Sequence, residues 1–249
     1  MERRALSPEL LDSRHLRIGF LASHHGSSMQ AVLGAIQEGQ LNATPAIVIS
    51  NNSREMAMKI AETLNIPRKH ISALTNPDDW EEEVSKTLLE HEVDIVVCSG
   101  WMKVFEKPIV PETFKDRIIN IHPSVHEEYM GSQWMEMAIH EAIIHDRDDP
   151  EKRRTHTGYT IHKLTQELDR GETLVTGFVR VSKLDTPVSL QLKVKEAEGK
   201  GIVGLLQDLS NPHKEELHIT TNNQVEVIDF PKMVNLNSTS LKSKFSLNF

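Results

Sequence analysis

Hydrophobic and amphipathic stretches alternate through the first half of the chain. Short runs that are hydrophobic at nearly every position are typical of buried parallel strands. They lie at residues 17–23, 46–50, 93–99 and 118–122. Periodic spacing of apolar residues around them predicts helices at residues 26–37, 54–64, 76–91 and 131–145. Because strands that alternate with helices pair in parallel, we expect an α/β fold with a doubly wound, mostly parallel sheet.

The second half of the chain contains two strand-like segments, 158–164 and 173–181, with only a short loop between them. A helical crossover does not fit into that loop, so the two strands should form an antiparallel pair at one side of the sheet. The charged run at 146–155 contains a proline and is expected to be a solvated loop.

Two of the helix starts carry capping signals. Asn76 precedes Pro77 and two aspartates, and Thr186 precedes Pro187. A short polar side chain followed by proline is typical of a helix N-terminus. We therefore expect one helix to begin at Asn76 and another at Thr186, the second continuing to about Leu209.

The periodic pattern ends near Leu209, and this sets the expected domain limits. Residues 1–14 would be a charged N-terminal extension, 15–209 the folded domain and 210–249 a C-terminal extension. Within that last segment, two strand-like runs flank Asn222-Asn223, a pair that suits a hairpin turn. The Ser-, Asn- and Lys-rich end, 235–249, is expected to be a flexible tail.

Composition excludes some classes of function. The formal net charge is -8, which argues against broad binding to nucleic acid. No apolar run is long enough for a membrane span, and the N-terminus lacks the core of a signal peptide. The single cysteine, Cys98, rules out an internal disulfide. Together these features favour a cytoplasmic protein without a membrane partner. We expect a monomer or a homodimer, a choice that these features do not decide.

The 13 histidines raise the question of a metal site. Pro123 interrupts any helix that would align His122 with His126, and His140 and His145 fall on different helical faces. With one cysteine and no His-Glu-x-x-His pattern, we expect no metal site. Cys98 lies in the middle of a predicted strand and is expected to be buried filler rather than a nucleophile.

The first candidate functional segment follows the first predicted strand. It reads Ser23-His24-His25-Gly26-Ser27-Ser28 and leads into a predicted helix. Backbone amides at a helix start can hold a phosphate, and doubly wound sheets bind ligands at this kind of position. Taken alone, the segment equally fits an ordinary strand-to-helix turn with serine caps.

The second candidate is the pair Asn120 and His122 at the end of a predicted strand. Alternate strand residues share a face, so both side chains should project the same way. An amide donor and a titratable imidazole can together support a developing oxyanion. Without further context, a hydrogen-bonded core histidine beside Pro123 is the simpler reading.

The third candidate is Asp169, on the short loop between the last two predicted strands. A carboxylate there can approach a histidine and raise its pKa, or relay a proton through water. Alone, an Asp before Arg170-Gly171 is a common turn residue.

Together the three segments resemble the glycinamide ribonucleotide formyltransferase family, whose members have a Rossmann-like fold. The matching motifs are Ser-x-x-Gly-Ser after the first strand, Asn-Ile-His-Pro-Ser at a later strand end and Leu-Asp-x-Gly on a late loop. Their order and approximate spacing agree with the family. Ile49-Ser50-Asn51 and Ser99-Gly100-Trp101-Met102 add to the resemblance, which covers about residues 17–209.

The resemblance implies a role for each matched residue. Asn120, His122 and Asp169 would catalyse formyl transfer from 10-formyltetrahydrofolate to glycinamide ribonucleotide in purine biosynthesis. The Gly26 loop would hold the substrate phosphate, and Glu198 would contact the ribose. The pterin of the folate would be framed by Trp101, Met102, Lys103, Val104, Leu168, Arg170 and Gly171. The folate is a co-substrate, and no tightly bound cofactor is implied.

The chain departs from the family pattern on the acceptor side. The family usually has Gly in place of His24, Asn in place of Ser28, and His after the glutamate that matches Glu198. Leu-Leu-Pro usually stands where this chain has Val125-His126-Glu127, and the run at 146–155 resembles an insertion. We therefore expect that His24 or His25, if protonated, contributes to the grip on phosphate.

Three alternatives stay open at this point. A hydrolase that deformylates the same folate resembles the family around Asn120 and His122, but it normally carries an N-terminal regulatory domain, for which residues 1–14 leave no room. Formyl transfer to an amino sugar or to methionyl-tRNA is a second alternative, and the acidic balance disfavours tRNA. A non-catalytic binding protein is the third, although a binder has no need to keep all three catalytic residues.

Overall fold

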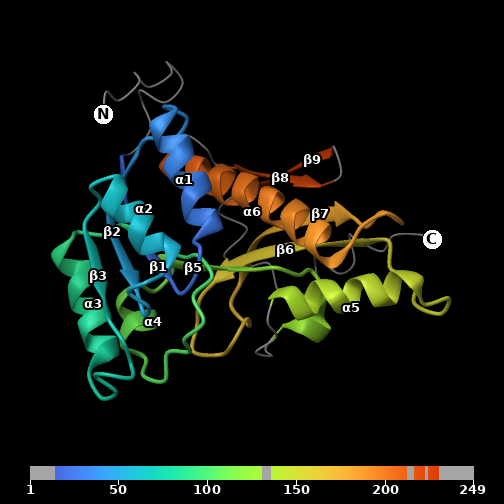
Figure 1. The fold of residues 1–249 in the computed structure, drawn as a ribbon. Coiled ribbons are helices and arrows are strands. Elements are labelled where there is room, and N and C mark those ends of the chain that lie inside the picture. The colour runs from blue at the N-terminus through green and yellow to red at the C-terminus, as the bar shows by residue number, and fades with distance from the viewer. Residues whose placement is uncertain (1–14, 131–135, 212–215, 222–223, 230–249) are drawn as a thin grey trace.

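The computed structural model describes residues 15–130, 136–211, 216–221 and 224–229 (Figure 1). A seven-stranded sheet with the strand order β3-β2-β1-β4-β5-β6-β7 forms its centre. The strands are β1 (Leu16–Ala22), β2 (Ala43–Ser50), β3 (Arg68–His70), β4 (Ile95–Cys98), β5 (Ile118–His122), β6 (His156–Lys163) and β7 (Thr173–Arg180).

The sheet is parallel from β3 to β5 and antiparallel from β5 to β7. This confirms the predicted doubly wound sheet and the antiparallel pair at its side. The pattern of hydrophobic residues predicted six of these strands and missed β3. That strand is three residues long and has no fully buried residue, so it has too little apolar sequence to be recognised.

Helices cover both faces of the sheet, as Figure 1 shows. They are α1 (Ser27–Gln37), α2 (Met56–Thr63), α3 (Trp80–Glu90), α4 (Ile109–Thr113), α5 (Glu136–Asp148) and α6 (Pro187–Ser210). One hydrophobic core joins α1, α2 and α6 to the sheet, and a second joins α3 and α4 to its other face. A smaller cluster packs α5 against α6. Among the described residues, no helix is long and apolar enough to cross a membrane.

The start of α6 forms as its sequence predicts. The Thr186 hydroxyl accepts a hydrogen bond from the Ser189 amide, and the Ser189 hydroxyl accepts one from the Thr186 amide, at 3.2 and 3.0 Å. This capping box, with Pro187 in the first turn, satisfies amides that have no partner inside the helix.

The predicted start of α3 at Asn76 is wrong. The helix begins at Trp80, and its N-cap residue, Asp79, makes no capping hydrogen bond with its side chain. The Asn76 amide instead donates to the Ser72 carbonyl and closes a preceding turn. The Asn76 carbonyl accepts the Trp80 amide, and residues 77–79 form a turn that leads into the helix.

The prediction that the whole 146–155 run is a solvated loop is also wrong. The helix α5 continues to Asp148, and Asp146 is buried near its end. Lys152 and Arg154 fold back to within 2.8 and 3.3 Å of the Asp146 carboxylate. Pairing with cations offsets the cost of burying this carboxylate. The charged run therefore contributes ion pairs that stabilise the end of α5.

The C-terminal extension contains the expected antiparallel hairpin strands, β8 (Glu216–Thr221) and β9 (Gln224–Asp229). Their turn at Asn222-Asn223, the segment 235–249 and the extension 1–14 lie outside the described residues. Residues 131–135 also lie outside the described residues. They form the start of the predicted helix 131–145, which corresponds to α5.

Candidate active site

The carboxyl ends of β1, β4 and β5 meet at one edge of the sheet, where doubly wound folds bind ligands. The loops after β1 and β4 are joined there by hydrogen bonds. Ser23 donates its amide to the Gly100 carbonyl at 3.3 Å and accepts the Met102 amide on its hydroxyl at 2.9 Å. The Ser99 hydroxyl accepts the Met29 amide of α1 at 3.1 Å. The two loops therefore form one connected unit.

Asn120 and His122 face the same side of the sheet, as strand alternation requires. The residue between them, Ile121, packs into the core under α1 and α6. Asn120 and His122 therefore face the side that α3 and α4 cover further along. Pro123 follows directly and ends the strand.

Asp169 reaches this pair from the loop between β6 and β7. Its Oδ2 lies 3.4 Å from His122 Nδ1, and its Oδ1 accepts a hydrogen bond from Asn120 Nδ2 at 3.4 Å. The Asp169 backbone has φ 54°, in the left-handed region that Asp tolerates better than most residues. The structure thus brings together the three residues that the motifs singled out.

His162 on β6 completes the group, and the motifs did not identify it. The Lys163 carbonyl accepts a hydrogen bond from His162 Nδ1 at 3.0 Å, which leaves Nε2 as the acceptor in the neutral ring. That Nε2 lies 3.3 Å from Asn120 Nδ2 and 3.5 Å from Asp169 Oδ1. The Asn120 amide is therefore directed at two protein acceptors.

Regular pairing of β5 with β6 places His162 in the site, because His162 lies directly opposite Asn120. The register shift at Ile161/His162 is on the other side of β6, where Leu174 of β7 is skipped in the pairing. Alternation along 158–164 would put His162 on one face of the sheet, but the sequence alone does not say that this face opposes Asn120. The pairing of Asn120 with His162 supplies that information.

His122 is buried, and burial is the largest influence on its pKa. Burial lowers that pKa from the ordinary value of 6.5, the Asp169 carboxylate raises it and His162 lowers it, with a net decrease. The neutral imidazole therefore predominates at neutral pH. Its Nε2 has no hydrogen-bond partner among the described residues. With Nδ1 facing Asp169, this nitrogen carries a lone pair suited to accept a proton.

The Gly26 loop leads directly into the N-terminus of α1. Gly26 is the N-cap of α1 with φ 64°, and no side chain caps the helix there. A Cβ at this position would lie 3.2 Å from Met29 Cε and 3.3 Å from Ala57 Cβ. Glycine is therefore favoured by both backbone and space, and a helix N-terminus is a position that can bind an anion. His24 and His25 are exposed beside the loop.

The residues assigned to the folate by resemblance divide into two kinds. The ring of Trp101 is packed into the core beside Trp80 and Phe105 and is only 8% exposed. Met102 and Val104 present apolar side chains to solvent, 50% and 37% exposed. The loop therefore offers Met102 and Val104, rather than the tryptophan ring, to a ligand.

The opposite loop, residues 168–171, is held close to β6. A Cβ on Gly171 would lie 1.7 Å from the Lys163 carbonyl oxygen, so only glycine fits there. Leu168 is half-buried and Arg170 is exposed.

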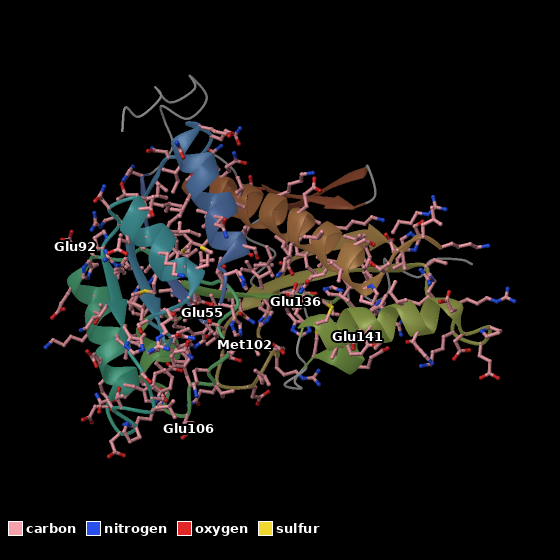
Figure 2. All side chains as sticks on the ribbon, in the orientation of Figure 1. Glu55, Glu92, Met102, Glu106, Glu136 and Glu141 are labelled. Atoms are coloured by element: carbon pink, nitrogen blue, oxygen red, sulfur yellow. The ribbon has the colours of Figure 1, made fainter. Side chains whose placement is uncertain are left out.

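Glu198 lies buried on α6, with an exposed fraction of 5%. Burial, then the nearby Glu136 carboxylate, raises its pKa from 4.5 to about 8, and Lys195 opposes this. Glu136, at the start of α5 (Figure 2), contacts Lys195 Nζ at 3.3 Å and His140 Nε2 at 3.8 Å. The neighbouring Gly199 packs so closely on α1 that a Cβ would lie 2.9 Å from Ala31. Glu198 therefore sits, protonated at neutral pH, where α1, α5 and α6 meet.

Within the part of the chain that the structure describes, no three His, Cys, Asp or Glu side chains are placed to hold a metal ion. Cys98 is fully buried in β4, and burial strongly raises the pKa of its thiol. A thiol in that state is a poor nucleophile.

The doubly wound sheet therefore carries the Asn-His-Asp group at the carboxyl ends of its central strands. The chain belongs to the formyl transferase family, whose sequence profile matches residues 16–206.

Similar proteins come from this family. A phosphoribosylglycinamide formyltransferase of Dictyostelium discoideum is 28% identical over 204 residues, which cover 76% of this chain and 96% of that protein. The human trifunctional purine biosynthetic protein adenosine-3 is 29% identical over 198 residues, and the match spans 79% of this chain but only 18% of the human protein. The structure of a phosphoribosylglycinamide formyltransferase from Coxiella burnetii matches with a TM-score of 0.71 and 28% identity, over 86% of this chain and 94% of the other.

Proposed function

We propose that this protein transfers the formyl group of 10-formyltetrahydrofolate to the primary amine of glycinamide ribonucleotide. One observation carries the proposal. His122 Nε2 has no partner among the described residues, while Nδ1 faces Asp169 and Asn120 lies on the same strand face. This arrangement offers a proton acceptor and an amide beside each other, as acyl transfer to an amine requires.

The reaction proceeds through a tetrahedral intermediate. The amine nitrogen attacks the formyl carbon, a new C–N bond forms, and the carbonyl electron pair moves to oxygen. His122 Nε2 takes a proton from the nitrogen, and the resulting imidazolium is stabilised by Asp169. The oxyanion then collapses, the bond from carbon to N10 of the folate breaks, and a proton passes to N10. The products are the formylated amine and tetrahydrofolate.

Asn120 supports this step in two ways. Its contacts to His162 and Asp169, at 3.3 and 3.4 Å, hold the carboxylate beside His122. These contacts are long, and catalytic hydrogen bonds often tighten only when substrate is bound. An amide hydrogen that is redirected to the oxyanion stabilises it together with the protonated His122. Loss of one oxyanion donor costs about 3 to 4 kcal/mol in well-studied acyl-transfer enzymes.

The acceptor side fits a phosphorylated sugar. The amides at the start of α1 suit a phosphate, and a protonated Glu198 can both donate and accept a hydrogen bond with a ribose hydroxyl. The names of the relatives point to the same acceptor. Whether His24 or His25 adds to the phosphate grip is tested by measuring acceptor affinity across neutral pH in a His24→Ala, His25→Ala double variant. Affinity that equals wild type at every pH would leave both histidines as bystanders.

The folate side uses the loops at 101–104 and 168–171. The exposed Met102 and Val104 supply an apolar surface for the flat pterin, and the close packing of Gly171 on β6 fixes the second loop. The folate is a co-substrate in this scheme, and the proposed location of the protein is the cytoplasm.

The deciding experiment is a screen of amine acceptors with 10-formyltetrahydrofolate, in which released tetrahydrofolate is followed by absorbance. Rapid release only with glycinamide ribonucleotide supports the proposal. Release without any amine identifies a hydrolase, and release with an amino sugar changes the acceptor. A protein that binds the folate and releases none is a binder. In the active case, His122→Ala should fold normally and lose most turnover, and near-wild-type turnover would make His122 structural.

A further inference from the structure

The segment between β4 and α4 has no regular secondary structure, yet it is fixed at both ends. Near its start, the Met102 amide donates to the Ser23 hydroxyl at 2.9 Å. Near its end, the Glu81 carboxylate of α3 accepts the Glu106 amide at 2.8 Å and the Lys107 amide at 3.2 and 3.1 Å. Two exposed apolar side chains, Met102 and Val104, lie between these fixed points.

Glu81 is one of the most buried carboxylates of the chain, with an exposed fraction of 2%. A buried carboxylate is costly unless hydrogen bonds or charges compensate it. Here the two loop amides supply charge-assisted hydrogen bonds, and the position in the first turn of α3 adds the favourable end of the helix dipole. The bonds also satisfy the Glu106 and Lys107 amides, which have no partner from regular secondary structure.

Aromatic packing fixes the middle of the same segment. Phe105 stacks on Trp80, the residue before Glu81, with ring centroids 5.4 Å apart and planes at 17°. Trp101 also stacks on Phe105, at 6.1 Å and 19°, and its ring lies 6.3 Å from that of Trp80, so the three rings form one cluster. The first two residues of α3 therefore hold the loop by a ring and a carboxylate. Figure 2 labels Met102, near the start of the segment, and Glu106, near its end, at separate places in the lower half of the view.

We propose that Glu81 is a positioning residue for the folate, which sets the place of Met102, Lys103 and Val104 by holding the end of their loop. This inference rests on the proposed function, because it takes 101–104 as part of the folate site. Glu81 does not touch the reacting atoms. Its loss should loosen the apolar surface offered to the pterin and leave the Gly26 loop and the His122 group as they are.

The test compares Glu81→Gln with wild type and with Glu83→Gln. Glu83 lies in the same turn of α3 but pairs with Lys69 at 3.0 Å, away from the loop. Tetrahydrofolate is the binding probe, with tryptophan fluorescence as the signal, and KM is measured for both substrates. Glu81→Gln should raise the Kd of tetrahydrofolate and the folate KM about tenfold, as expected for one charge-assisted hydrogen bond. The acceptor KM and kcat at saturation should stay within about twofold of wild type, and Glu83→Gln should change nothing.

Equal rises in both KM values, or a folded Glu81→Gln variant with unchanged folate affinity, would overturn the inference. If Glu81→Gln does not fold, Glu81→Asp replaces it, since the charge is kept and only the reach to the amides is shortened. Hydrogen exchange at Lys107 then reports whether the contact is lost, and unchanged folate affinity despite that loss again overturns the inference. A wild type that binds tetrahydrofolate but formylates no amine removes the proposed function alone. A wild type that does not bind tetrahydrofolate removes both.

Discussion

Asn120 on β5 and His162 on β6 face each other across an antiparallel pair, with Asn120 Nδ2 3.3 Å from His162 Nε2. The Lys163 carbonyl accepts a hydrogen bond from His162 Nδ1. The hydrogen of the neutral ring is therefore on Nδ1, and Nε2 can accept a hydrogen bond. A backbone group of β6 thus determines how a side chain of β5 is oriented.

His162→Ala should lower kcat about tenfold or more, which corresponds to at least about 1.4 kcal/mol of activation free energy. The reason is that Asn120 loses one of the two acceptors that orient its amide. KM for either substrate should change little, since His162 is buried and belongs to neither proposed binding loop. Steady-state kinetics measure both quantities. The control is His156→Ala, at the exposed far end of the same strand. If both variants lose activity equally, His162 has no special role.

The acid limb of kcat/KM should reflect His122. Protonation removes the lone pair at Nε2, and the pKa of His122 lies below the ordinary 6.5, so activity should fall only as the pH drops below about that value. Asp169 raises this pKa, so Asp169→Asn should move the acid limb to still lower pH and reduce kcat. A pH profile of both proteins decides the matter. An acid limb that moves upward in Asp169→Asn contradicts the assignment.

Gly26→Ala should weaken acceptor binding selectively. The added Cβ would meet Met29 and Ala57 at 3.2 and 3.3 Å on a backbone with positive φ, which disfavours side chains. We expect the acceptor KM to rise about tenfold or more while the folate KM stays near wild type. Gly34→Ala on the same helix is the matched control, because its Cβ would meet nothing within 4 Å. A rise in the folate KM instead would place the phosphate site elsewhere.

Glu198 should make the protein less stable as the pH rises. The folded pKa of about 8 exceeds the ordinary 4.5, so the folded state holds a proton that the unfolded state has lost. The free energy of unfolding should therefore decrease between about pH 4.5 and about pH 8. Glu198→Gln should flatten this decrease.

Chemical denaturation at the two ends of that pH range provides the measurement. The control is Glu141→Gln on the exposed face of α5 (Figure 2). The groups that surround Glu198, namely Glu136, Lys195 and Tyr159, are retained in both variants. An unchanged slope in Glu198→Gln would mean that another group causes it.

Truncation after Asn211 should preserve turnover. The described catalytic, phosphate-loop and folate-loop residues all precede that position, and α6 ends at the buried Ser210. A chain that ends at Asn211 should therefore fold and keep kcat within about twofold. Circular dichroism verifies the fold before activity is measured. A folded but inactive truncation would assign a catalytic role to the C-terminal extension.

Local sequence patterns predicted the elements of this site better than its contacts. The shared face of Asn120 and His122 follows from strand alternation alone. Their approach to Asp169, by contrast, was expected only from family resemblance, since no local rule brings a distant loop to a strand end. His162 escaped because its place beside Asn120 depends on the register between β5 and β6, which the local pattern does not specify.

Glu81 shows why charge runs are hard to interpret. It stands in a row of three glutamates, which is typical of a solvated helix face. The structure buries this one and exposes Glu82, because only Glu81 turns toward the amides of a neighbouring loop. Asn76 presents the opposite case, because its strong local capping signal is followed by a turn at residues 77–79 and the helix starts only at Trp80.

The site straddles the line where the sheet changes from parallel to antiparallel. Asn120 and Asp169 meet although 49 residues separate them, and that stretch includes α5 and all of β6. No continuous fragment shorter than this span contains the trio. Closing such a loop costs entropy that only the completed β5–β6 pairing repays. The three residues therefore come together only when the parallel and antiparallel parts of the sheet are joined. Turnover consequently reports whether the β5–β6 pairing has formed.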